Sequence, residues 1–112
     1  MWIFLNDAFL SIVADRNDPD NLLVRARFPA DIERIFPDAE VIETPNADYR
    51  FRASLRRNQV SRIVGDKVLA LAATNFKASV IDRWRHSVYF DVWKCMTDAQ
   101  RRLHARERRC CL

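Results

Sequence analysis

The chain has 112 residues, of which 49% are hydrophobic and 30% are charged, and its formal net charge is +4. This composition excludes a disordered chain, and the length suits one domain with a real core. No run reaches the roughly 18 uninterrupted apolar residues of a membrane-spanning helix, and the apolar start lacks the basic leader of a signal peptide, so we expect no membrane partner.

Charge is distributed unevenly between the two halves of the chain. Residues 1–48 carry four arginines against ten acids, a net charge of 4 − 10 = −6, and residues 49–112 carry fifteen Lys and Arg against five acids, a net charge of 15 − 5 = +10. Such a split favours one acidic and one basic surface, and basic surfaces attract nucleic acid or acidic proteins. The alternative is that the halves neutralise each other across the fold.

The three cysteines are an odd number, and two of them are adjacent. A disulfide framework is therefore not expected, and reduced thiols indicate a cytoplasmic protein. A zinc site can be drawn from Cys95, His104, Cys110 and Cys111, but no C-x-x-C or H-x-x-x-H spacing supports it. We predict no metal and no cofactor.

The first elements are predicted to be strands. Residues 2–5 and 9–14 are apolar runs on either side of the turn pair Asn6-Asp7, which indicates two strands with a tight connection or one strand with a bulge. A polar loop over residues 15–21 leads to a strand over residues 22–28 that returns antiparallel. In this strand the apolar residues alternate with Arg25 and Arg27.

A short helix and two more strands follow. Pro29 suits the first turn of a helix, Pro37 ends it, and its face with Ile32, Ile35 and Phe36 packs inward. Residues 40–44 are the next predicted strand. In residues 49–55 the apolar positions, Tyr49 among them, have one parity and Arg50, Arg52 and Ser54 have the other, as in a half-buried strand.

The remaining sequence has helical periodicity. One helix is predicted over residues 58–73, capped by Asn58 or begun at Arg56 or Arg57, and a second follows a cap at Ser79. The inner side of the second helix is predicted to consist of Val80, Ile81, Trp84, Val88, Val92 and Met96. Beyond about residue 103 we expect fraying. We therefore predict a single domain over residues 1–100 with a basic tail over residues 101–112.

The predicted fold class is α+β: an antiparallel sheet of four to five strands, with a short helix between strand pairs and two C-terminal helices packed on one face. In this arrangement Trp84, Val88 and Val92 meet Val24, Phe28, Phe51 and Leu55 in the core.

Three segments carry a resemblance to known proteins. They are MWIFLNDAFLSIV at residues 1–13, RFPADIERIFP at residues 27–37 and NFKASVIDRWRH at residues 75–86, followed by Tyr89 and the pair Val92-Trp93. Together they resemble a family of short uncharacterised bacterial proteins, over most of residues 1–96. The resemblance implies a cytoplasmic protein of bacterial or phage origin and assigns no functional residue.

Arginines of two predicted strands form the first candidate site. If these strands are neighbours, Arg25, Arg27, Arg50 and Arg52 form a patch that can hold phosphates or carboxylates bidentately. With Phe9 or Trp2 it would resemble a stacking platform for single-stranded nucleic acid. The alternative is a solvated face whose charges are paired with Glu40 and Glu43 on the adjoining strand.

The last predicted helix carries the second candidate site. Asp82 and His86 are four residues apart, as are Arg85 and Tyr89, so each pair can touch on the helix surface. A carboxylate that orients an imidazole beside a phenol is a candidate acid–base set. No positioned nucleophile or second carboxylate accompanies it, so docking of the helix is favoured over catalysis and no catalytic residue is predicted. Arg85, His86 and Tyr89 are predicted to bind the partner, together with the four arginines of the strands.

These observations favour a small non-enzymatic interaction protein that docks on or masks a charged macromolecular partner. The partner would be an acidic protein or a nucleoprotein complex, and one concrete form is an inhibitor of a host or defence nucleoprotein complex, similar in style to an anti-CRISPR protein. The alternatives are a nucleic-acid-binding regulator that uses the basic half, and an enzyme centred on His86. A homodimer through the open sheet face is compatible with all three.

Overall fold

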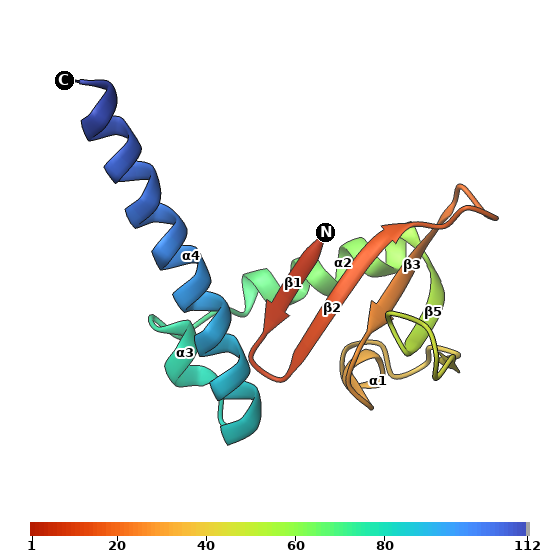
Figure 1. Cartoon of the computed structure of the whole chain (residues 1–112). Coiled ribbons are helices and arrows are strands. Elements are labelled where there is room, and N and C mark those ends of the chain that lie inside the picture. The colour runs from red at the N-terminus through yellow and green to blue at the C-terminus, as the bar shows by residue number, and fades with distance from the viewer. Residues whose placement is uncertain (112) are drawn as a thin grey trace. The chain divides into compact units, whose positions relative to one another are not determined.

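The computed structural model describes residues 1–111, which fall into two compact units, Met1–Thr74 and the segment from Asn75 onward (Figure 1). The first unit contains the sheet and two helices, and the second contains two helices. The single domain predicted over residues 1–100 and the basic tail over residues 101–112 stay predictions.

The sheet of the first unit has five strands within the described residues, and every neighbouring pair is antiparallel. They are β1 (Trp2–Leu5), β2 (Ala8–Ala14), β3 (Asn21–Ala26), β4 (Ile42–Glu43) and β5 (Phe51–Arg56), in the spatial order β1-β2-β3-β5-β4. The predicted α+β class is confirmed. The hairpin of β1 and β2 turns at Asn6-Asp7 as expected, whereas β4 is only two residues long, shorter than the predicted strand.

One face of the sheet, called here the inner face, carries the hydrophobic core. Alternate residues of the three central strands are buried on it, because successive side chains leave a strand on opposite sides. Helices α1 (Asp31–Ile35) and α2 (Arg57–Leu69) contribute to the same core. The buried cluster consists of Ala8, Leu10, Ile12, Val24, Ala26, Ile32, Ile35, Phe36, Ala53, Leu55 and Val60.

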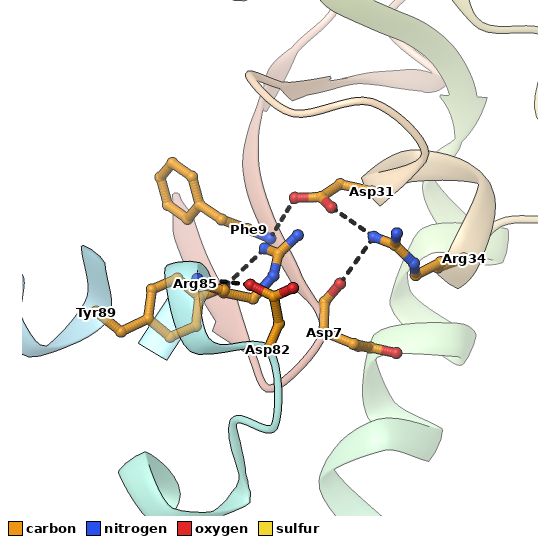
Figure 2. Close-up of polar contacts among 7 residues, drawn as sticks. All are labelled: Asp7, Phe9, Asp31, Arg34, Asp82, Arg85 and Tyr89. Atoms are coloured by element: carbon orange, nitrogen blue, oxygen red, sulfur yellow. Dashed lines mark hydrogen bonds and ion pairs between the residues drawn. The ribbon is translucent and has the colours of Figure 1, made fainter. Parts of the chain in front are cut away.

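A buried carboxylate fixes α1 to the edge of β2. Asp31 is fully buried, and its Oδ2 accepts a hydrogen bond from the Phe9 backbone N–H at 3.0 Å, while its Oδ1 forms an ion pair with Arg34 at 2.8 Å (Figure 2). Arg34 also donates to the backbone carbonyl of Asp7 at 3.1 Å. A buried carboxylate is stable only when it is paired and hydrogen-bonded, so this network holds the entry of α1 in one geometry.

Two residues at or within the helices of the first unit are unusual for their backbone position. Ala30, at the N-cap of α1, has a φ of 67°, which is the left-handed region that side chains other than glycine rarely adopt. Gly65 lies inside α2, and a Cβ built there would have no heavy atom within 4 Å. Helix α2 begins at Arg57, in agreement with one of the predicted starts.

The second unit consists of α3 (Phe76–Ser79) and α4 (Arg83–Cys110). Side chains cap both helices: Asn75 accepts from the backbone N–H of Ala78 at 3.2 Å, and Asp82 accepts from that of Arg85 at 2.8 Å. The prediction of Ser79 as the cap of the long helix is therefore wrong. Ser79 is the last residue of α3, and Asp82 starts α4 because its carboxylate reaches the third residue along.

The predicted inner side of the last helix also needs correction. Ile81 is 91% exposed, Trp84 is 60% exposed and Met96 is 68% exposed, so they are not core residues. Val92 is 37% exposed. Regular helix continues to Cys110, past the expected fraying point near residue 103, and Leu112 lies outside the described residues. No helix among residues 1–111 is both long enough and apolar enough to cross a bilayer.

Candidate functional site

The face of the sheet opposite the core, called here the outer face, carries one row of side chains across all five strands. Trp2 of β1 is opposite Ser11 of β2, and Ser11 is opposite Arg25 of β3. Arg25 is in turn opposite Arg52 of β5, which is opposite Ile42 of β4. The register therefore confirms that the two predicted Arg-x-Arg strands are neighbours.

The centre of this row is held by a tyrosine. The guanidinium carbons of Arg25 and Arg27 lie 4.4 Å and 4.1 Å from the centroid of the Tyr49 ring, as in cation–π pairs. Arg25 also donates to Ser11 Oγ at 2.8 Å, and Arg52 Nε donates to the backbone carbonyl of Tyr49 at 3.2 Å. We call these five residues the Tyr49 cluster.

The environment of Tyr49 is both buried and polar. Its side chain is only 4% exposed, and this burial by itself raises the pKa of the phenol. Hydrogen bonding to Ser11 and Arg27, together with the positive charge of Arg27, outweighs burial and brings the pKa below its ordinary value of 10.0. The phenol is thus tied into the cluster through its oxygen as well as its ring.

Two of the four predicted arginines are neutralised by acids within the fold. Arg27 forms an ion pair with Asp48 at 2.9 Å, which raises the pKa of the guanidinium. Arg50 pairs with Glu43 of β4 at 2.6 Å. The predicted role of Glu43 is confirmed, whereas Glu40 forms no ion pair with these arginines among the described residues.

The other two arginines have no acidic partner in the part of the chain that the structure describes. Arg25 and Arg52 stand directly opposite each other on adjacent strands, where like charges are destabilising. The Nε atom of Arg25 is buried and makes no hydrogen bond to any of residues 1–111. Both side chains are half-buried and oriented by neutral groups, so their positive charge is available to an anion.

An open cavity of about 880 Å³ lies over this pair of arginines. Its lining combines charged groups with apolar walls: Val13, Ala14, Asp15, Arg16, Asn17, Leu23, Arg25, Ile42, Arg52, Ala53 and Ser54. Three arginines and one aspartate give the lining a formal charge of 3 − 1 = +2. Asp15 Oδ2 accepts from the Ser54 hydroxyl, which lowers the pKa of the carboxyl and keeps it ionised.

The candidate acid–base set on the last helix is not assembled. The Asp82 carboxylate caps α4 through the backbone N–H of Arg85 (Figure 2). Among the described residues it makes no hydrogen bond or ion pair with the His86 ring. His86 is exposed. Arg85 and Tyr89 are together, with Arg85 Nη1 donating to Tyr89 Oη at 3.2 Å, and both are buried. The predicted partner-binding role of Arg85, His86 and Tyr89 stays a prediction.

The cysteines are free and exposed in the described chain. No group of three or more His, Cys, Asp or Glu side chains among residues 1–111 is placed to hold a metal ion. His104 instead forms an ion pair with Glu107 at 3.3 Å along α4. The zinc site that the sequence allows on paper is therefore not assembled.

Sequence reasoning missed two members of the cluster. Parity alone assigns Tyr49 to the core face. However, β5 begins at Phe51, so the alternation does not extend back to Tyr49, and its ring lies against Arg25 and Arg27. Ser11 appeared as one polar residue in an apolar strand. That signal could have been used, because a lone hydroxyl flanked by apolar residues often marks the polar face of a half-buried strand.

Comparison with known proteins gives no relative. No family model, no curated protein and no solved structure matches the chain. The resemblance to short bacterial proteins therefore stays an expectation.

Proposed function

We propose that the protein is a non-enzymatic interaction protein that docks on an acidic macromolecular partner through the Tyr49 cluster and the cavity beside it. The observation that supports this most is the pair Arg25 and Arg52. Their guanidinium groups lie in a cavity, are oriented by a tyrosine and a serine, and have no carboxylate partner within residues 1–111.

The cost of this arrangement to the fold supports a role in binding. Two like charges on directly opposed positions weaken strand pairing, and the same fold neutralises Arg27 and Arg50 with acids. Burying guanidinium groups without a counter-charge costs stability, so an arriving anion would relieve a cost already built into the fold. An inhibitor that covers an acidic surface of its target would need only this binding of anionic groups and no catalytic residue.

Affinity capture from a bacterial lysate tests this function. We expect the wild-type chain to enrich a protein or nucleoprotein partner and the double variant R25Q/R52Q to lose it. The matched control R62Q/K67Q removes the same charge from exposed positions of α2 and should retain the partner. Equal capture by both double variants, or no enrichment by the wild type, would contradict the proposal.

Nucleic-acid binding through α4 is a second candidate function. Five exposed arginines occupy its last turns, and three of them, Arg102, Arg106 and Arg109, share one face through their spacing of four and three. Such a face can follow a phosphate backbone, with salt-sensitive affinity. A mobility-shift assay at two salt concentrations tests it, and binding that does not change with salt or is absent argues against it.

A further inference from the structure

We propose that the cavity is a carboxylate pocket that receives one acidic side chain of a protein partner, with an apolar residue of the same partner segment beside it. This inference rests on the proposed function and names the chemical group that docks. Every residue that carries it belongs to the first unit.

The two arginines supply a prepared receptor for a carboxylate. Arg25 is fixed by its hydrogen bond to Ser11 at 2.8 Å and by its stacking on Tyr49. Arg52 uses its Nε on the Tyr49 carbonyl, which leaves its terminal nitrogens free of hydrogen bonds within residues 1–111. A planar guanidinium with oriented N–H groups matches the two oxygens of a carboxylate, and fixing it in advance reduces the entropy lost on binding.

The walls of the cavity add an apolar requirement. Val13 and Leu23 lie on neighbouring strands at opposed positions, and Ile42 is opposite Arg52 on the short edge strand. Ile42 is 68% exposed, so an apolar group that covers it gains burial. A ligand with a carboxylate at one end and methylene or methyl groups at the other therefore satisfies both parts of the lining.

Asp15 distinguishes a carboxylate from a phosphate. Its carboxylate lies in the same cavity and is kept ionised by the hydrogen bonds that it accepts from Ser54 and from the backbone N–H of Asn17, the latter at 2.9 Å. A second negative charge on a ligand would meet this fixed charge, whereas a monoanion needs only the two arginines. The lining thus favours a carboxylate over a dianionic phosphate group.

Nuclear magnetic resonance on the full chain tests this pocket with defined probes. The arginine Nε–Hε signals are followed while hexanoate, inorganic phosphate or 1-hexanol is added at constant ionic strength. We expect saturable shifts of the Arg25 and Arg52 signals with hexanoate, and at least fivefold weaker binding of phosphate and hexanol. Phosphate binding as tightly as hexanoate would overturn the proposal in favour of a phosphate site, and shifts that do not saturate would overturn it outright.

Variants separate the two halves of the pocket. R52Q should weaken hexanoate binding at least tenfold, and the control R62Q should leave it unchanged. I42S should weaken hexanoate more than acetate, because only the longer chain reaches the apolar wall. Equal weakening of both by I42S would contradict the apolar requirement.

The outcomes also distinguish this inference from the proposed function. If capture of a partner depends on Arg25 and Arg52 but hexanoate does not bind, docking stands and the carboxylate pocket fails. If hexanoate binds as expected and no partner is captured, the pocket stands and the proposed function fails.

Discussion

The two faces of the sheet are made by the same strands but stabilised by different interactions. On the inner face, side chains such as Leu10 and Val24 are fully buried in a core shared with α1 and α2. On the outer face, one residue further along each strand, Ser11 and Arg25 are held by hydrogen bonds and an aromatic ring. The inner face is stabilised by the burial of apolar side chains, whereas the outer face contains two opposed arginines that have no acidic partner within residues 1–111.

If this contrast is right, the inner face should show the largest loss of stability. Leu10→Ala removes a fully buried side chain from the centre of the core, and we expect a decrease of about 3 kcal/mol in the free energy of unfolding. Chemical denaturation measures it. The exposed Ile42 on the edge strand is the control, since Ile42→Ala should change stability by less than about 0.5 kcal/mol. Similar losses at both positions would break the comparison.

The buried carboxylate of α1 should give the next largest effect. Asp31→Ala leaves the Phe9 backbone N–H without its acceptor and Arg34 without its ion pair, so we expect a loss of about 2 kcal/mol. Glu33→Ala, at an exposed acid in the same first turn, should cost less than about 0.5 kcal/mol. Denaturation curves of the two variants should therefore be clearly separated, and coincident curves would deny Asp31 its structural role.

Arginines of the outer face should separate into two classes. Arg27→Gln breaks the half-exposed ion pair with Asp48, and we expect a loss of up to about 1 kcal/mol. Arg52→Gln removes one of two opposed like charges, and we expect stability to stay within about 0.5 kcal/mol of the wild type or to rise. Thermal or chemical denaturation compares them. A larger loss for Arg52→Gln than for Arg27→Gln would mean that Arg52 is structural.

The smallest expected effect concerns pH. Hydrogen bonding to Ser54 lowers the pKa of Asp15, so this carboxyl adds stability above its unfolded pKa and loses that contribution as pH falls through the folded pKa. Ser54→Ala should raise the pKa of Asp15 toward its ordinary value of 3.8, as followed by the carboxyl carbon signal in an NMR titration. An unchanged titration would show that the hydroxyl does not stabilise the charged form.

The period of two and the turn residues were sufficient to predict the sheet. Asn6-Asp7, the polar loop after β2 and the alternation around Arg25 and Arg52 each predict a feature that the backbone register bears out. Local chemistry decided these features, because strand parity and turn propensity act over a few residues. The identity of the arginine face followed from the same pattern.

Features that depend on where an element begins could not be predicted in this way. Tyr49 lies two residues before β5, so parity gave it the wrong face. Ser79 and Asp82 are both acceptable caps by residue type, and only the extended residues between α3 and α4 select Asp82. The pairing of Arg27 with Asp48 and Arg50 with Glu43 likewise depends on tertiary geometry that composition does not contain.

The two unusual backbone positions of the first unit are the reverse of what conformational energies favour. The single glycine of the sequence, Gly65, lies inside a helix, where alanine would be more stable by about 1 kcal/mol. Ala30 instead has a left-handed backbone conformation, which costs a residue other than glycine about 1 kcal/mol. Exchanging the two, by Ala30→Gly and Gly65→Ala, would raise stability without touching either sheet face. The chain is therefore less stable than its fold allows. The two substitutions would provide extra stability, which would help variants of the arginine face to stay folded.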